Sequence, residues 1–393
     1  MITQRMIDWG ASGCLIREIS EFAENLAKEK GADKVFNFSI GSPSVEPPAI
    51  LQETITRLME TTSPVQLHAY TPAAGLPEVR RAMAEFLNKQ FKVHYDADDI
   101  YMTAGACGAL AVIIHALNTA GDRVVTLTPY FNEYKVYVEH AGASIVEVPS
   151  RPEDLQIDIE AMDKAITADV SSVLLNSPNN PSGVIIRAEG IKALAALLEK
   201  KQKEFGHPIY IIADEPYREL VYGGVEVPFI SEYYKNTVYC YSFSKTMSIP
   251  GERVGFLAAS KECENHDAIM CAIAGATRVL GFINVSCMFQ LVVKECAGYT
   301  ADISKYEANR NFIYDSLTEL GFSCVKPDGA FYLFMKLPGK PGEFVQRAKE
   351  LGVMIVPGEE FSYPGFARLA YCVPMEKLQG SMPVFKQLAK EFL

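Results

Sequence analysis

Four short apolar runs recur along the middle of the chain, and small or polar residues end each of them. They cover residues 124–128, 172–176, 209–213 and 237–242. These runs are continuously apolar rather than alternating, which is typical of parallel strands buried on both faces of a sheet. Helical periodicity lies between them, for example in EGIKALAALLEKKQ at residues 189–202. The pattern therefore predicts an α/β fold with a mainly parallel sheet.

The pattern changes at the two ends of the chain. After about residue 290 we expect a long helix over roughly residues 286–320, then short strands and a helix from Glu343, which together predict a smaller α+β domain. Helical periodicity also runs from Cys14 to Lys30, and we expect the N-terminal 45 residues to pack on the smaller domain. The predicted division is a large domain over residues 46–290 and a small domain formed by residues 1–45 and 291–393.

Size, charge and cysteine content narrow the class of protein. The chain has 393 residues, of which 49% are hydrophobic, enough for one large core and a smaller domain. The net charge of -11 and the lack of a basic stripe argue against nucleic-acid binding. We find no signal peptide, and no apolar run reaches the roughly 18 residues of a membrane span. Nine scattered cysteines without a CxxC pair predict reduced thiols in a cytoplasmic protein, with no disulfide framework and no metal site.

Polar residues follow the predicted strands at their carboxyl ends. These residues are Asn180, Asp214, Tyr217 and Lys245. In open α/β sheets, ligands bind beyond the carboxyl ends of the strands. Each residue alone has a structural explanation, as a turn residue, a helix cap, a core tyrosine or a surface lysine. Their common position at one edge of one sheet favours a shared site.

The chemistry of this set suits pyridoxal 5'-phosphate, an aldehyde cofactor that acts as an electron sink. Lys245 would form a Schiff base with the aldehyde, and burial or nearby positive charge would lower the pKa of its amine. Asp214 would keep the ring nitrogen protonated, while Tyr217 and Asn180 would hydrogen-bond the ring oxygen. Once substrate displaces Lys245, the same amine is placed to move the α-proton as a general acid/base.

The phosphate of this cofactor has a predicted cradle in the same region. TAGACGALAVI is a small-residue loop that opens a helix, and the free N–H groups of a helix N-terminus bind anions. We therefore assign Gly105, Ala106 and Cys107, together with Ser242 and Arg253, to the phosphate. The alternative is that the loop serves only close packing and that Arg253 is a surface charge.

Motifs from about Gly41 to Arg368 resemble those of the class I/II aminotransferases, which are fold-type I pyridoxal-phosphate enzymes of the aspartate aminotransferase superfamily. SFSK followed by R-x-G, NNPSG and ADEPY carry the resemblance and contain Lys245, Asn180 and Asp214. SxxK also occurs in β-lactamase-type hydrolases, but their SDN and KTG motifs are missing here. The resemblance implies a three-layer α/β/α large domain with a mainly parallel seven-stranded sheet.

The resemblance also implies roles for residues outside these motifs. Phe131 would stack on the cofactor, and Gly41 and Asn180 would lie beside the substrate. Arg368 would bind the substrate α-carboxylate through two guanidinium nitrogens. Tyr70 would reach the phosphate of the neighbouring subunit, which implies a homodimer with shared sites. Without the resemblance, Phe131 fits a core phenylalanine at a strand end equally well. The alternative for Tyr70 is a loop tyrosine in a proline-rich turn.

The predicted reaction is transamination. An L-amino acid gives its amino group to the cofactor and leaves as a 2-oxo acid, and a second 2-oxo acid, which we expect to be 2-oxoglutarate, accepts it in a ping-pong cycle. Aspartate or an aromatic amino acid is the expected substrate class, although Cys107 stands where some dicarboxylate-preferring relatives carry lysine. The alternative is a C–S or β-eliminating lyase on the same fold, because both reactions begin with removal of the α-proton. We also expect cis peptide bonds before Pro129 and Pro181.

Overall fold

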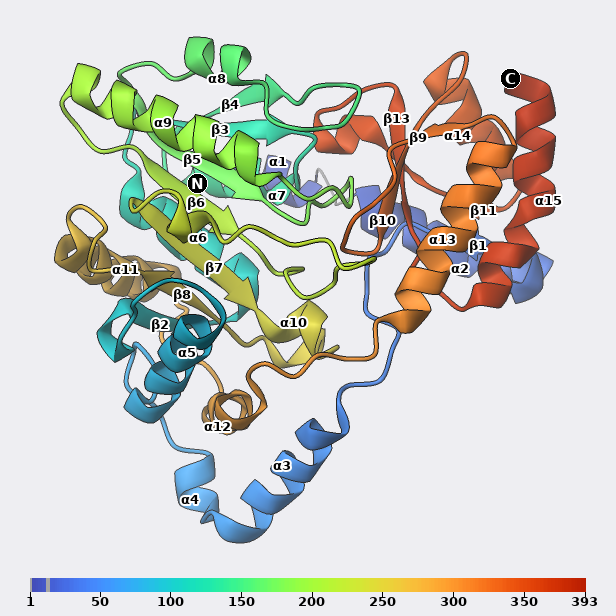
Figure 1. Ribbon diagram of the computed structural model, residues 1–393. Helices are drawn as coiled ribbons and strands as arrows, with labels where there is room; N and C mark the ends of the chain where they lie inside the picture. Colours follow the sequence, from blue (N-terminus) through green and yellow to red (C-terminus); the bar gives the residue numbers. More distant parts are fainter. Residues whose placement is uncertain (1, 12–14) are drawn as a thin grey trace.

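The computed structural model describes residues 2–11 and 15–393, and its largest element is a seven-stranded sheet (Figure 1). The strand order is β2-β8-β7-β6-β5-β3-β4. Neighbours pair in parallel except at β8, which runs antiparallel to both β7 and β2. The strands are β2 (Ile100–Thr103), β3 (Arg123–Thr128), β4 (Ser144–Pro149), β5 (Val170–Asn176), β6 (Tyr210–Asp214), β7 (Thr237–Ser242) and β8 (Gly255–Ala259).

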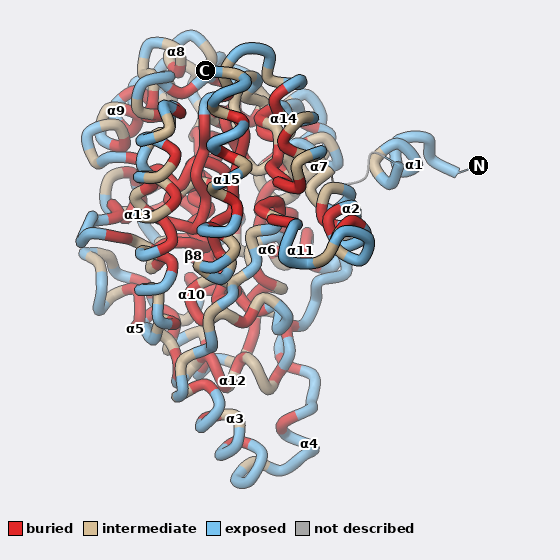
Figure 2. The backbone as a smooth tube through the Cα atoms, turned by 90° about the vertical axis from the view of Figure 1, so that its right-hand side faces the viewer, coloured by how far each residue is buried: buried red, intermediate tan, exposed pale blue. Residues whose placement is uncertain are grey.

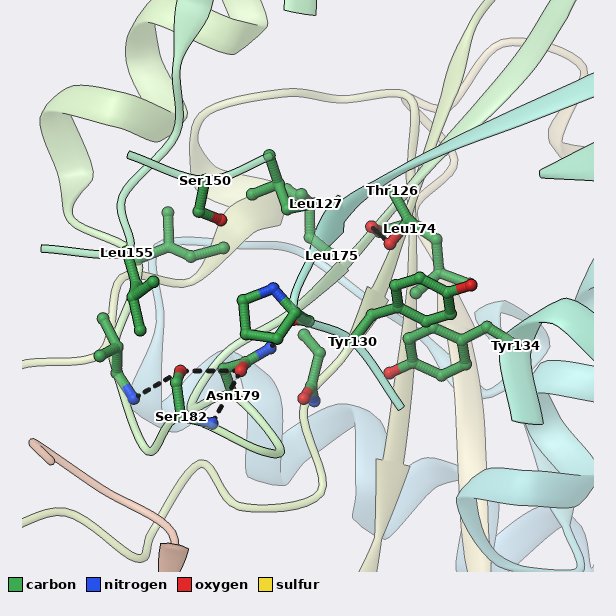
Figure 3. Close-up of a pocket in the computed structure, with 14 residues that line it drawn as sticks. Thr126, Leu127, Tyr130, Tyr134, Ser150, Leu155, Leu174, Leu175, Asn179 and Ser182 are labelled. Carbon is green, nitrogen blue, oxygen red and sulfur yellow. Dashed lines mark hydrogen bonds between the residues drawn. The ribbon is translucent and has the colours of Figure 1, made fainter. Parts of the chain in front are cut away.

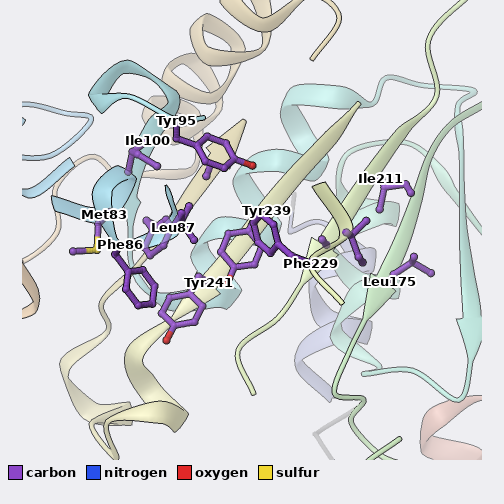
Figure 4. Packing of buried hydrophobic residues seen from close by; sticks show 14 of the residues in the cluster. Met83, Phe86, Leu87, Tyr95, Ile100, Leu175, Ile211, Phe229, Tyr239 and Tyr241 are labelled. Atoms are coloured by element: carbon purple, nitrogen blue, oxygen red, sulfur yellow. The ribbon is translucent and has the colours of Figure 1, made fainter. Parts of the chain in front are cut away.

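Helices cover both faces of this sheet and produce three layers. Val238 and Cys240 of β7 belong to the core on one face of the sheet. Tyr239 and Tyr241 belong to the core on the other face, which Figure 4 shows. Burial on both faces explains why the strands have continuous apolar sequences. The helices of one face are α6 (Gly105–Leu117), α7 (Glu133–His140) and α11 (His266–Leu280), and those of the other are α3 (Ala49–Thr61), α5 (Pro77–Gln90), α8 (Ile159–Ala165), α9 (Ala188–Phe205) and α12 (Cys287–Cys296).

The main predictions about this sheet are confirmed. Strands β3, β5 and β7 cover three of the apolar runs, β6 covers the fourth from residue 210 onward, and the sheet is mainly parallel with seven strands. The peptide bonds before Pro129 and Pro181 are cis, as is the bond before Pro178.

The prediction of one long helix over residues 286–320 is wrong. Helix α12 ends at Cys296, and α13 (Ser304–Glu319) begins only after a connection. Gly298 in that connection has a φ of 90°, which lies outside the helical region and suits glycine. The backbone N–H of Ala301 then donates to the carbonyl of Thr246 at 2.8 Å. The break therefore lets this segment support the turn that carries Lys245.

The C-terminal part of the chain forms a second, smaller set of elements. An antiparallel sheet has the order β12-β13-β10-β9, and it lies beside α13, α14 (Pro341–Glu350) and α15 (Met375–Phe392) (Figure 1). Its strands are β9 (Ser323–Cys324), β10 (Tyr332–Lys336), β12 (Val356–Pro357) and β13 (Phe366–Ala370). The apolar residues of this part form a core that is separate from the two cores of the large sheet.

Residues 15–37 of the N-terminal segment pack on this smaller part, as expected, whereas Trp9 in the preceding helix contacts His140 of α7. Strand β1 (Phe36–Asn37) pairs in parallel with β11 (Val353–Met354), and α2 (Leu15–Lys30) contacts both strands. Cys14, where the sequence pattern begins this helix, lies outside the described residues. The division into residues 46–290 and residues 1–45 with 291–393 stays a prediction.

Helix α1 (Gln4–Ala11) lies at the edge of the molecule, and none of its residues is buried (Figure 2). Trp9 packs against His140 at the end of α7, with ring centroids 5.9 Å apart. Among the helices of the described ranges, none combines the length and the hydropathy that a membrane span requires.

Candidate active site

A cavity of about 380 Å³ lies where the carboxyl ends of the large sheet meet β10, β13 and the segment around Gly41. Residues from distant parts of the sequence therefore line one space. Most of the predicted site residues are among them, namely Gly41, Ala106, Cys107, Phe131, Asn180, Asp214, Tyr217, Ser242, Lys245, Arg253 and Arg368. The position agrees with the general location of ligands in open α/β sheets.

A second cavity behind β3 and β5 is too small for a cofactor (Figure 3). Its volume is about 20 Å³, which is close to the space that one water molecule needs. Ser182 donates a hydrogen bond to Oδ1 of Asn179 at 2.7 Å beside it. This hydrogen bond orders the turn that presents Asn180 to the larger cavity.

Lys245 is partly buried in α10 (Phe243–Thr246), the short helix that follows β7. Its Nζ donates to the carbonyl oxygen of Gly41 at 2.9 Å and lies 5.9 and 5.5 Å from the ring centroids of Tyr217 and Phe331. Burial lowers the pKa of this amine to about 8, and the positive charges of Arg368 and Arg253 act in the same direction. A neutral amine is the nucleophilic form of lysine, so this environment favours covalent chemistry.

Asp214 ends β6 and is held through one of its two carboxylate oxygens. The hydroxyl of Tyr134 donates to Oδ2 at 2.5 Å, and Nδ2 of Asn176 donates to the same atom at 3.3 Å. Oδ1 is buried and has no hydrogen-bond partner among the residues that the structure describes. Burial raises the pKa of this carboxyl to about 7. An unpaired buried carboxylate oxygen in the cavity wall fits a protonated pyridine nitrogen, and so the residues present fit pyridoxal phosphate.

Arg368 is 2% exposed, so it is a buried arginine and not a surface charge. It lies in β13, and one of its guanidinium nitrogens donates to Oδ1 of Asn180 at 2.9 Å, while another donates to the carbonyl of Ser39. The guanidinium carbon lies 4.7 Å from the ring centroid of Tyr332 and 4.9 Å from that of Phe361. These contacts fix the plane of a cation that borders the cavity.

The residues predicted to hold the phosphate lie at the start of α6, at the end of β7 and in the segment after α10, and their role stays a prediction. Gly105 begins α6 with a φ of 70°, and a Cβ atom there would lie 2.9 Å from a guanidinium nitrogen of Arg253. Glycine is therefore needed both for the backbone conformation and for the close approach. Arg253 also donates to Oγ of Ser244 at 3.4 Å, and Ser242 donates to the same oxygen at 2.8 Å. Cys107 is exposed, and a thiol supplies no positive charge to the cradle.

Tyr70 is 94% exposed and lies outside the cavity of its own chain, and its role toward a neighbouring subunit stays a prediction. Sequence reasoning missed Tyr134, Asn176 and Tyr332, which contact the predicted residues directly. Tyr134 stands three residues after Phe131, and Asn176 ends the predicted apolar run 172–176, whereas nothing in the sequence near Tyr332 links it to Tyr217.

Comparisons with known proteins agree with this geometry. A "Probable aspartate/prephenate aminotransferase" of Aquifex aeolicus is 31% identical over 381 residues, with 93% of each chain covered. The structure matches an aminotransferase of Eubacterium rectale with a TM-score of 0.98 at 44% identity, covering 100% of this chain and 99% of the other. It matches the aspartate aminotransferase of Thermus thermophilus with maleate at a TM-score of 0.84 and 25% identity, covering 95% and 96%. These matches do not favour a lyase.

The family assignment rests on nearly the full length of the chain. Residues 33–380 match the family model of aminotransferase class I and II, and this range contains the whole lysine-centred cavity apart from the side chains contributed by α2. The chain therefore belongs to the class I and II aminotransferases, enzymes that transfer amino groups with pyridoxal phosphate.

Proposed function

We propose that the cavity around Lys245 is the site of transamination. The observation that carries the proposal is the convergence in one cavity of an amine with a lowered pKa, an unpaired buried carboxylate oxygen and a buried guanidinium. Asp214 would hold the ring nitrogen of the cofactor, Tyr217 and Asn180 would hydrogen-bond its ring oxygen, and Phe131 would pack on the ring. Pyridoxal phosphate, when bound, supplies an aldehyde for amino groups and a sink for the electrons released at the substrate α-carbon.

The side chains around the substrate have separate tasks. Nζ of Lys245 takes the proton from the α-carbon and returns it during the transfer, and a pKa near 8 suits this work close to neutral pH. Arg368 binds the α-carboxylate, because a planar guanidinium pairs with a carboxylate through two parallel hydrogen bonds. Gly41 brings its backbone to the same carboxylate. Gly105, Ala106, Cys107, Ser242 and Arg253 hold the phosphate at the other end of the cavity.

We propose aspartate or an aromatic amino acid as donor and 2-oxoglutarate as acceptor. The cavity wall contains both a cation from α2, Arg17, and apolar side chains such as Ile16 and Phe131, so it suits either class. A panel of L-amino acids with 2-oxoglutarate, followed by product 2-oxo acid, tests this. Aspartate or an aromatic amino acid should give the highest kcat/KM. A clear preference for a basic or small aliphatic amino acid would contradict the proposed substrate class.

We propose that the enzyme is a cytoplasmic homodimer whose partner subunit supplies Tyr70. Large apolar side chains are exposed on two segments. The first is the loop that carries Tyr70, which is 94% exposed, and the second begins at Val279, which is 83% exposed. Asn284 donates to the carbonyl of Thr71 at 2.6 Å, and Gln290 donates to its hydroxyl at 3.1 Å, so the Tyr70 loop is fixed to the second segment. A fixed, exposed apolar surface is typical of a protein interface.

Mixed dimers test this arrangement directly. A Lys245→Ala chain and a Tyr70→Ala chain are each expected to form weakly active or inactive homodimers. After unfolding, mixing and refolding, a mixed dimer has one complete site, because the Lys245→Ala chain supplies its intact Tyr70 to the site of the other chain. Transamination should therefore rise well above the sum of the two parents. No rise, with mixed dimers demonstrated by mass spectrometry, would contradict a shared site.

A further inference from the structure

Tyr332 at the start of β10 contacts both ends of the proposed site. Its hydroxyl lies 3.0 Å from the hydroxyl of Tyr217, and its ring packs 4.7 Å from the guanidinium carbon of Arg368. The side chain is 2% exposed. Within the described part of the chain, this hydroxyl has no other hydrogen-bond partner than Tyr217. Tyr332 is thus positioned by the small antiparallel sheet against a cofactor-side residue and a substrate-side residue.

The hydrogen bond between the two tyrosines has two possible directions. Each hydroxyl has one hydrogen, so only one of the pair can donate to the other. If Tyr217 uses its hydrogen for the cofactor ring oxygen, its own oxygen becomes free to accept from Tyr332. A hydroxyl that accepts a hydrogen bond becomes a stronger donor, because successive hydrogen bonds polarise one another.

The space beside Tyr332 is restricted in a way that fixes its hydroxyl. A Cβ atom at Gly41 would lie 2.0 Å from the Tyr332 hydroxyl oxygen. The ring is also held by the T-shaped contact with Tyr217, with ring centroids 5.8 Å apart, and by Phe331 at 5.0 Å. The hydroxyl therefore has little freedom to move away from Tyr217.

We propose that Tyr332 is a positioning residue that donates to Tyr217 and thereby directs the Tyr217 hydroxyl hydrogen at the ring oxygen of the cofactor. Its ring meanwhile keeps the Arg368 guanidinium in the plane that receives the substrate carboxylate. The inference rests on the proposed roles of Tyr217 and Arg368. It assigns one side chain of β10 to the geometry of both the cofactor and the substrate.

The test is a pH titration of the absorbance of the cofactor in the holoenzyme, with Tyr332→Phe, Tyr217→Phe and the double variant. A hydrogen bond to the negatively charged ring oxygen stabilises the deprotonated chromophore, so its loss raises the titration midpoint. We expect an upward shift of about one pH unit for Tyr217→Phe and of roughly 0.3 unit for Tyr332→Phe. The double variant should shift no further than Tyr217→Phe, because Tyr332 acts through Tyr217.

Two further variants and a measurement of thermal unfolding separate a positioning role of Tyr332 from a general loss of structure. Tyr371→Phe is a matched control, since Tyr371 is also fully buried in the small antiparallel region but does not line the cavity, and it should leave the midpoint unchanged. Tyr332→Leu, which removes the ring as well, should raise KM for the amino acid more than Tyr332→Phe does. Thermal unfolding of each variant reports whether the fold is retained.

The outcomes distinguish this inference from the proposed function. An upward shift for Tyr217→Phe with none for Tyr332→Phe would overturn the positioning role and leave the assignment of Tyr217 intact. Additive shifts in the double variant would also overturn it, because Tyr332 would then act independently. No shift for Tyr217→Phe would remove the donor assignment of Tyr217 and the inference with it.

Discussion

Replacing Lys245 by alanine is expected to lower the rate of transamination by at least about 10⁴-fold, since the variant loses the acid/base amine at the α-carbon and the nucleophile for the cofactor. The Lys245→Ala chain should also lose covalent attachment of pyridoxal phosphate. Mass spectrometry after borohydride reduction measures this attachment, and peptide mapping should locate it on Lys245 in the wild type. Lys340→Ala is the control, because Lys340 is 79% exposed and pairs only with Glu343 in the described structure.

The pH dependence of cofactor capture follows from the same residue. Burial lowers the Lys245 pKa to about 8 in the cofactor-free protein, so the neutral, nucleophilic amine increases as pH rises through this value. The rate of covalent capture should therefore rise between about pH 7 and pH 9 and level off above. A rise that continues to the pKa of an ordinary lysine, about 10.4, would show that the environment does not lower the pKa.

Replacing Arg368 by alanine is expected to reduce kcat/KM for the amino acid by about 100-fold or more, mainly through KM. The variant loses the charge-assisted hydrogen bonds to the α-carboxylate, each of which contributes about 1.5–3 kcal/mol. The cofactor should still be bound covalently, because Lys245, Asp214 and the phosphate cradle do not depend on this guanidinium for their contacts. Steady-state kinetics together with the absorbance of the bound cofactor measure both effects.

A matched comparison shows whether the effect of Arg368→Ala is local. Arg347→Ala removes an arginine that pairs with Glu391 and Glu350 on the surface, away from the cavity, and it should leave KM unchanged. Thermal unfolding should be measured as well, since Arg368 is buried and its loss removes one donor from Oδ1 of Asn180 and one from the carbonyl of Ser39. An Arg368→Ala enzyme with normal KM would exclude this residue from carboxylate binding.

The amino-acid sequence was sufficient to predict a mainly parallel sheet and the polar residues that lie at its carboxyl edge. Continuous apolar runs identified β3, β5, β6 and β7 because burial on both faces leaves no polar alternation. Asn180, Asp214 and Lys245 could be placed together because parallel strands bring their carboxyl ends to one edge. These predictions depend on local patterns and on one general rule of α/β folds.

Other parts depend on contacts that no local pattern reports. The break between α12 and α13 follows from the conformation of Gly298 and from the bond between Ala301 and Thr246, which lie far apart in the sequence. Tyr332 meets Tyr217 only because β10 packs against the large sheet. Tyr134 lies close to Phe131 in the sequence, but its bond to Asp214 requires the turn between β3 and α7.

The central claim is that Lys245 and its neighbours perform transamination in this cavity. The most direct test mixes the holoenzyme with one L-amino acid substrate and no acceptor, and counts the 2-oxo acid released per chain. The wild type should release close to one equivalent and continue only when 2-oxoglutarate is added, whereas Lys245→Ala should release no measurable amount. Continuous release without an acceptor, or an undiminished burst from Lys245→Ala, would contradict the account.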